Sequence, residues 1–183
     1  AVATIALREA ENGREFVRCA SAAAGFPIRI IDGLEEARLV HLGTRYGLDL
    51  DRRRVAIFDM GGGSTEVIVA NNGDCEFTAS LRLGTLRLRS QWDCTEPPTS
   101  NDLARLDALA SDCLKPTLAH VRRLGIDFAV LSCGTARTLS QLASADPISI
   151  VDERPKHGRG SYLSLSALRR VERRLSTIRP EDR

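Results

Sequence analysis

The chain has 183 residues, of which 43% are hydrophobic, so it can bury the core of one domain or of one domain and part of a second. Its 26 basic residues nearly balance 24 acidic ones, which argues against the overall positive field typical of nucleic-acid-binding proteins. No apolar run has the length of a membrane-spanning helix. The sequence therefore predicts neither a nucleic-acid partner nor a membrane partner.

The five cysteines are odd in number and widely spaced, no C-x-x-C pair occurs, and the three histidines are scattered. This distribution predicts reduced thiols rather than a disulfide framework or a zinc site. The sequence shows no signal peptide, so we expect a cytoplasmic location. Because the chain opens on AVATIALREA without an initiator Met, we also expect it to be a fragment of a longer polypeptide.

The first 50 residues are predicted to alternate short strands with helices. The apolar pattern predicts strands at 1–5 and 28–31, and helices at 6–24 and 34–46. Gly13 is a weak point of the first helix, whereas Asp32 is the expected N-cap of the second, with Glu35 completing a capping box.

The middle of the chain predicts three strands in succession. They are expected at 54–59, 66–70 and 76–83, and the tight turns between them favour an antiparallel meander. The elements expected after the meander are a helix at 101–124, a strand at 127–131, a helix at 136–143 and a basic helix at 165–175. Pro116 should kink or split the first of these helices.

The segment DMGGGSTE at 59–66 joins the first two strands and carries the clearest chemical signal. Its glycines allow the backbone to turn through positive φ and to approach a ligand closely, so that successive N–H groups can bind an anion. The expected anion-binding residues are Gly61, Gly62, Gly63 and the hydroxyl-bearing Ser64 and Thr65.

Other phosphate-binding loops fit this segment less well. A Walker A loop requires a lysine, which is absent, and a dinucleotide-binding turn requires a helix after its glycines. The β-branched stretch EVIVA follows instead, which favours a hairpin tip that wraps a phosphate. Asp59 and Glu66 flank this tip, and carboxylates so placed are typical Mg²⁺ ligands. The alternative is a plain hairpin turn with both acids in solvent.

Two adjacent glutamates, Glu35 and Glu36, open the helix predicted at 34–46. Neighbours on a helix point about 100° apart, so one can cap the helix while the other faces a cleft. A carboxylate facing a phosphate site can orient and deprotonate an attacking water. The alternative is that both acids lie on the surface and complement the helix dipole.

The turn SCGT at 132–135 follows a strand and opens a helix, which is a placement that binds anions. Gly134 would permit close approach and Thr135 could contact the ligand, although an ordinary N-cap explains the same pattern. Cys133 has no histidine at a recognisable spacing, so a nucleophilic role is disfavoured.

A basic stretch near the end of the sequence has two interpretations. It is either a solvated helix face or one wall of a groove for a long polyanion, which guanidinium groups can bind in a bidentate manner. Its members are Lys156, His157, Arg159, Arg169, Arg170, Arg173 and Arg174.

Six segments of this sequence recur in one known family. They are ATIALR at 3–8, IDGLEEAR at 31–38, FDMGGGSTE at 58–66, SLRLG at 80–84, CGTARTL at 133–139 and HGxG…L at 157–165. Together they resemble the exopolyphosphatase / guanosine pentaphosphate phosphatase (Ppx/GppA) family. The resemblance implies an α/β fold of the ribonuclease H-like (actin-like ATPase) type, with a mixed sheet flanked by helices. It also implies an incomplete pair of lobes, with residues 1–50 ending the first lobe and 51–183 forming a truncated second lobe.

The resemblance also implies roles for individual residues. Glu36 matches the catalytic glutamate that activates the attacking water, and Arg8 matches an arginine that contacts phosphate. Asp59 matches a metal-linked acid, and Glu66 an acid of the same loop that handles metal or water. The residues that match phosphate-binding positions are Gly61, Gly62, Gly63, Ser64, Gly134 and Thr135.

The implied activity is release of the terminal phosphate from polyphosphate or guanosine pentaphosphate, with Mg²⁺ or another divalent cation as cofactor. The resemblance also implies that two copies of the chain can pair as a homodimer. The sequence departs from the family at Leu131 and Cys133, and it lacks a first phosphate loop of the D-x-G-S-N-S type. Two alternatives stay open: a non-catalytic polyphosphate- or nucleotide-binding module, and a sugar-kinase-like ATPase.

Overall fold

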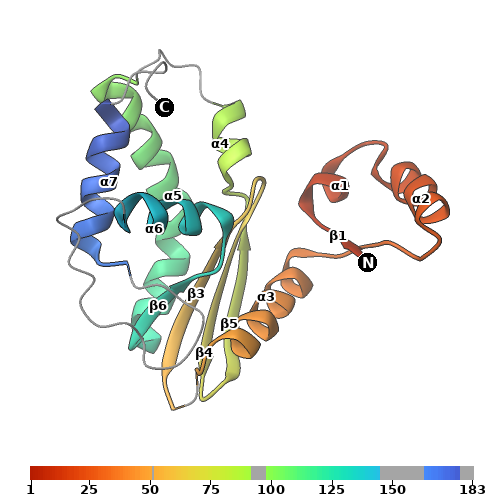
Figure 1. Cartoon of the computed structure of the whole chain (residues 1–183), viewed down its shortest axis with the longest axis horizontal. Helices are drawn as coiled ribbons and strands as arrows, with labels where there is room; N and C mark the ends of the chain where they lie inside the picture. Colours follow the sequence, from red (N-terminus) through yellow and green to blue (C-terminus); the bar gives the residue numbers. More distant parts are fainter. Residues whose placement is uncertain (51, 92–97, 145–162, 178–183) are drawn as a thin grey trace.

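The computed structural model of the chain describes residues 1–50, 52–91, 98–144 and 163–177 (Figure 1). Its strands form a two-stranded sheet, β1-β2, and a four-stranded sheet in the order β5-β4-β3-β6. None of the helices in the described ranges is both long enough and apolar enough to cross a membrane.

The N-terminal elements lie to one side of the larger sheet (Figure 1). They are β1 (Val2–Ala3), α1 (Ile5–Glu9), α2 (Gly13–Ala24) and β2 (Arg29–Ile30), with β1 and β2 parallel. The prediction of one helix over 6–24 was wrong, because the chain turns at residues 10–12. Gly13 begins the second helix so close to the first that a Cβ on it would lie only 1.9 Å from the carbonyl oxygen of Leu7.

The next helix, α3 (Gly33–Gly47), begins where the sequence predicted. The side chain of Asp32 caps it by accepting a hydrogen bond from the N–H of Glu35 at 2.8 Å. The second half of the predicted capping box was wrong, because the Glu35 carboxylate pairs with the guanidinium of Arg29 instead. The two adjacent glutamates therefore have different partners: the Glu35 carboxylate binds Arg29, whereas that of Glu36 lies near Arg8.

The predicted antiparallel meander is confirmed as β3 (Arg54–Met60), β4 (Thr65–Asn71) and β5 (Asp74–Leu81). Asn72 and Gly73 form the second turn with φ values of 51° and 81°, as a tight hairpin requires. The strand β6 (Phe128–Leu131) pairs parallel to β3, so the sheet is mixed.

The remaining helices are α4 (Thr85–Ser90), α5 (Ser100–Leu124), α6 (Gly134–Ser144) and α7 (Leu165–Thr177). The short helix α4 was not predicted. Pro116 lies inside α5, which nevertheless continues as one helix. Of the two outcomes predicted for this proline, a kink or a split, the split was therefore wrong.

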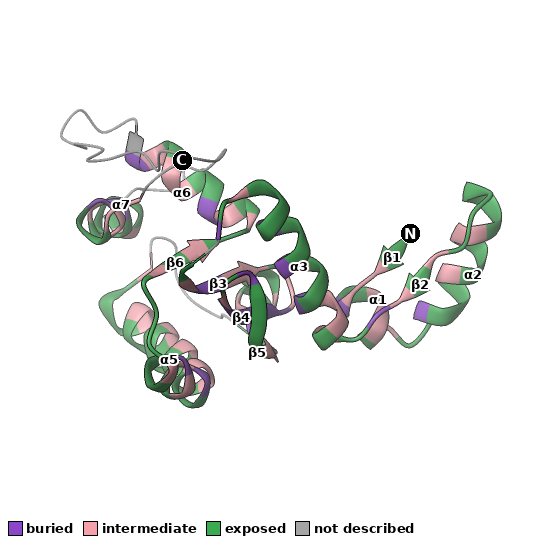
Figure 2. Ribbon diagram, turned by 90° about the horizontal axis from the view of Figure 1, so that it is seen from below, coloured by how far each residue is buried: buried purple, intermediate pink, exposed green. Residues whose placement is uncertain are grey.

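The alternation of side chains along β3 and β4 builds two cores on opposite faces of the sheet (Figure 2). Val55, Ile57, Ile68 and Ala70 pack with Ala37 of α3. The intervening residues of both strands pack with Val121 of α5. Because the side-chain period of a strand is two, the α3 face continues to Asp59 on β3 and to Glu66 on β4.

We predict that Asp32→Ala lowers the free energy of unfolding by about 1 kcal/mol, because the Glu35 N–H then loses its capping acceptor. Urea denaturation of the protein would measure the change. Asp107→Ala, an exposed acid within α5, is the matched control and should have little effect. Equal stability of the Asp32 variant and the parent would contradict the assigned cap.

Candidate functional site

The three-glycine turn between β3 and β4 is held by the start of α4. The N–H of Gly61 bonds the carbonyl of Ser64 at 2.9 Å and closes the turn. The carbonyl of Gly61 accepts from the N–H of Thr85, and the carbonyl of Gly62 accepts from the N–H of Leu86 at 2.8 Å. The N–H groups of Gly62, Gly63 and Ser64 donate to no group within the described residues, so they are the candidate donors to a ligand, with Ser64 itself only 2% exposed.

The glycines of this turn are needed for close packing rather than for unusual backbone angles. The prediction of positive φ at residues 61–63 was wrong, since the glycines with positive φ in the described part lie elsewhere. A Cβ on Gly62 would lie 2.9 Å from Leu86, and one on Gly63 would lie 2.6 Å from Ile5. A Cβ on Gly84 would lie 2.4 Å from the Gly62 carbonyl oxygen. The turn is therefore confined by both α4 and α1.

Asp59 and Glu66 lie opposite each other on β3 and β4, at the end of the sheet nearest this turn. Glu66 is 2% exposed, and its Oε1 accepts a hydrogen bond from the Ser80 hydroxyl of β5 at 2.8 Å. Ser80 in turn lies under the first turn of α3, since a Cβ on Gly33 would be 2.3 Å from its Oγ. This stacking brings Glu36, also in the first turn of α3, to the face that carries both acids.

Glu36 is held by Arg8 from α1. The Nη1 of Arg8 lies 3.6 Å from the Oε2 of Glu36, an ion pair that is too long for a hydrogen bond, and it donates to the carbonyl of Ile31 at 2.6 Å. The same Oε2 is buried and has no hydrogen-bond partner among the described residues. A buried carboxylate oxygen without a donor is costly, which is typical of a group that meets a ligand.

Negative charge accumulates at this end of the sheet. Burial raises the pKa of Glu36 above its usual value, and the nearby charge of Glu66 raises it further, while Arg8 opposes the shift. Burial followed by the charge of Glu66 also raises the pKa of Asp59. The site therefore favours a positive ion or a proton among its carboxylates.

The acids fit a divalent cation only in combination with a ligand. No group of three or more His, Cys, Asp and Glu side chains suited to a metal occurs in the described residues. Mg²⁺ does not need such a group, because one or two carboxylates with phosphate oxygens and waters complete its coordination. Asp59 and Glu66 meet that smaller requirement.

The second predicted turn lies one strand away. The N–H of Ser132 bonds the carbonyl of Phe58 at 2.9 Å, so the turn follows β6 beside the end of β3, next to Asp59. Helix α6 begins at Gly134, where a Cβ would meet no atom within 4 Å. The Sγ of Cys133 accepts from the N–H of Ala136 at 3.3 Å, so the thiol occupies an N-cap position.

Two functional candidates were missed by sequence reasoning. Ser80 orients Glu66, as described above, and Arg87 of α4 donates from Nε to the carbonyl of Gly63 at 2.9 Å. Both lie in or next to the segment SLRLG, which the resemblance had marked. Their contacts cross between elements, and no local pattern indicates which partner each will meet.

The basic helix α7 packs on α6 through Ala167 and Val171, which share a core with Ala143. Arg169, Arg173 and Arg174 are exposed, as both interpretations of this segment expect. Lys156, His157 and Arg159 lie outside the described residues.

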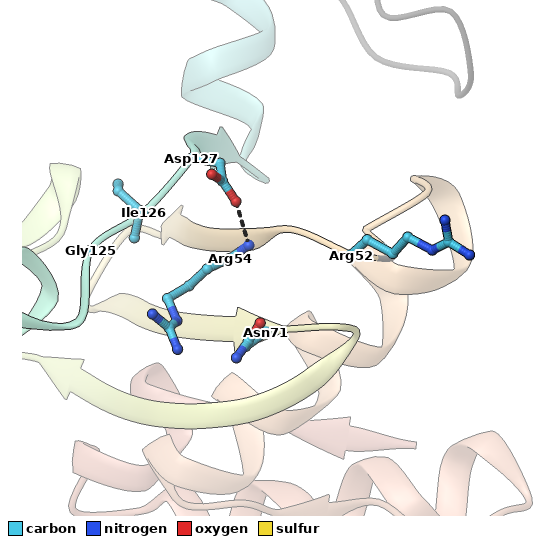
Figure 3. A pocket seen from close by; sticks show the side chains of 6 residues that line it. All are labelled: Arg52, Arg54, Asn71, Gly125, Ile126 and Asp127. Atoms are coloured by element: carbon cyan, nitrogen blue, oxygen red, sulfur yellow. Dashed lines mark hydrogen bonds between the residues drawn. The ribbon is translucent and has the colours of Figure 1, made fainter.

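A pocket of about 450 Å³ lies at the opposite end of β3 from the glycine turn (Figure 3). The guanidinium of Arg54 lines it but is already bonded to Glu76 and to the carbonyl of Leu124. Its other lining residues are Arg52, Asn71, Gly125, Ile126 and Asp127. The pocket is therefore separate from the candidate site.

We predict that Gly33→Ala destabilises the protein by about 1–3 kcal/mol, because the added methyl group overlaps Ser80 and forces α3 away from β5. Chemical denaturation would measure the loss. In a Ser80→Gly background the same substitution should cost clearly less, because the overlapping atoms are gone. Equal costs in the two backgrounds would contradict the proposed contact.

Comparisons with known proteins identify the family and the fold of the chain. Residues 1–182 match the model of the Ppx/GppA phosphatase family. The chain is similar to the Aquifex aeolicus PPX-GPPA enzyme, with a TM-score of 0.77 and 25% identity over 99% of this chain and 57% of that chain. It is also similar to an exopolyphosphatase from Cytophaga hutchinsonii ATCC 33406, with a TM-score of 0.85 and 22% identity over 100% of this chain and 58% of that chain.

These matches confirm the predicted actin-like α/β fold, with its mixed sheet flanked by helices. The chain spans little more than half the length of these solved structures. The predicted boundary between two lobes at residue 50 stays a prediction, and α3, from before that boundary, packs on the larger sheet.

Proposed function

Because the chain belongs to the Ppx/GppA phosphatase family, we propose that the protein is a phosphohydrolase that releases the terminal phosphate of inorganic polyphosphate or guanosine pentaphosphate. One observation carries the proposal. A turn with three N–H groups that bond no other described residue lies at the end of the sheet where Asp59, Glu66 and Glu36 gather on one face.

In the proposed reaction the turn binds the terminal phosphoryl group. The N–H groups of Gly62, Gly63 and Ser64 offset its negative charge, with Gly61 and Thr65 fixing the two ends of the turn. Donors held in place before the substrate arrives need no rearrangement as charge shifts during the reaction, which is why a confined turn suits this role.

Glu36 is the proposed base. Its Oε2, which accepts no hydrogen bond from the described residues, would accept one from a water, orient that water for in-line attack on phosphorus, and take its proton. Arg8 lies beside this carboxylate and would also attract a phosphate oxygen. Gly134 and Thr135 begin α6 directly after β6, the strand that pairs with β3, so they would contact the phosphate chain from a second side.

Asp59 and Glu66 are the proposed ligands of Mg²⁺ or another divalent cation. When bound, the cation would neutralise the phosphate oxygens and so ease attack by water. Burial and, after it, the charge of Glu66 raise the pKa values of Glu36 and Asp59, and a nearby cation would favour the charged form of both carboxylates, which supports this assignment.

The direct test is phosphate release from polyphosphate and, in parallel, from guanosine pentaphosphate, with Mg²⁺ and with the cation chelated. We expect Mg²⁺-dependent release from at least one substrate. Binding without release would favour a non-catalytic module. Hydrolysis of ATP only when a sugar is added would favour a kinase-like ATPase, and either result would overturn the proposal.

Glu36→Gln should reduce kcat by about 10²–10⁴-fold while polyphosphate still binds, because the amide keeps the shape of the side chain but cannot accept a proton. A phosphate-release assay and a binding titration measure the two effects. Glu35→Gln is the matched control. The Glu35 carboxylate pairs with Arg29 rather than facing the site, so this variant should keep its activity. Normal turnover by the Glu36 variant would refute its role.

Asp59→Asn should raise the Mg²⁺ concentration needed for half-maximal activity by about tenfold or more, because one of the charged cation ligands is lost. A titration of the initial rate with Mg²⁺ would show this. Asp74→Asn, at the exposed turn between β4 and β5, removes the same charge at a distance and should leave the titration unchanged. An unaltered Mg²⁺ requirement in the Asp59 variant would exclude it as a ligand.

A further inference from the structure

One side chain ties the three-glycine turn to the N-terminal elements. Arg87 of α4 donates from Nε to the carbonyl of Gly63 at 2.9 Å, and its Nη2 donates to the Oε2 of Glu9 in α1. The Arg87 side chain is 20% exposed, so most of it is shielded from solvent. A planar guanidinium that bonds two elements at once restricts how they sit relative to each other.

Helix α1 contacts the site at more than this one point. Ile5, Arg8 and Glu9 are spaced three and four positions apart, so they lie on one face of the helix. Ile5 packs against Gly63, and Arg8 reaches Glu36. The contact between Glu9 and Arg87 is therefore part of a continuous surface between α1 and the site.

The contacts of the turn also decide where its free donors point. In a trans peptide the carbonyl of one residue and the N–H of the next point in opposite directions. All three glycine carbonyls of the turn are held from the α4 side, the first two by backbone N–H groups and the third by Arg87. The three N–H groups that follow them, those of Gly62, Gly63 and Ser64, must then point away from α4.

We propose that Arg87 is a positioning residue for phosphate binding: by holding the Gly63 carbonyl it directs the Ser64 N–H into the anion site, and Glu9 holds Arg87 in the required orientation. The first two carbonyls have backbone donors that no side-chain substitution removes. The Gly63 carbonyl depends on the Arg87 guanidinium, so a substitution of Arg87 can change the orientation of this part of the turn. The inference rests on the proposed function of the turn as the phosphate site.

Titration of the full protein, labelled with ¹⁵N-glycine and ¹⁵N-serine, with inorganic phosphate in the presence of Mg²⁺ tests this role directly. In the parent the amide signals of Gly62, Gly63 and Ser64 should shift together. Arg87→Ala should raise the Kd for phosphate about tenfold, the loss expected for one hydrogen bond to a charged group. The Ser64 amide should lose most of its shift.

Arg82→Gln is the matched control. Arg82 lies 3.0 Å from the other oxygen of Glu9 and is 72% exposed, so this change removes one positive charge without touching the turn. Its Kd should stay within about twofold of the parent value, as expected for an exposed ion pair. Adding Glu9→Gln to Arg87→Ala should weaken phosphate binding no further, because Glu9 acts through Arg87.

An unchanged Kd in Arg87→Ala, or an equal loss in Arg82→Gln, would overturn the inference. If the alanine variant does not fold, Arg87→Lys replaces it, since lysine keeps the charge but cannot bond Gly63 and Glu9 through one planar fork. Phosphate release is assayed separately. A parent protein that binds phosphate through these amides but hydrolyses nothing would refute the proposed reaction and leave the role of Arg87 standing.

Discussion

The candidate site depends on the contact between the first turn of α3 and strand β5. Gly33 has no side chain, so the helix backbone rests on Ser80, whose hydroxyl donates to the carboxylate of Glu66. A larger residue at that position would lift the helix from the sheet. Because Glu36 lies one helical turn further along, this contact decides whether its carboxylate meets the acids of β3 and β4 or points into solvent.

This arrangement does not help the fold, because it places negative charges close together. Burial and the charge of Glu66 raise the pKa values of both Glu36 and Asp59, and Arg8 is the cation that opposes the shift at Glu36. Uncompensated buried charge destabilises a protein, and clusters of perturbed acids are typical of sites that bind cations or transfer protons. The rest of the sheet, with an apolar core on each face, provides the stability that permits the cluster.

The glycine turn is shaped by the elements around it. Glycine-rich segments suggest backbone freedom, yet these residues have ordinary φ values and are packed between α4 and α1. Their value lies in the missing side chains, which let Leu86 and Ile5 approach. Residues of α4 donate hydrogen bonds to the carbonyls of the turn, so the N–H groups of the turn face away from α4.

Local patterns in the sequence determined the meander, the start of α3 and the different directions in which Glu35 and Glu36 point, because strand alternation, capping and the 100° step of a helix act between near neighbours. The same patterns missed the break after α1 and the helix α4, where a turn and a short segment are set by packing. Tertiary structure alone decided that Glu9 meets Arg87, 78 residues further along the chain. Such contacts arise only when the elements come together, so no spacing in the sequence records them.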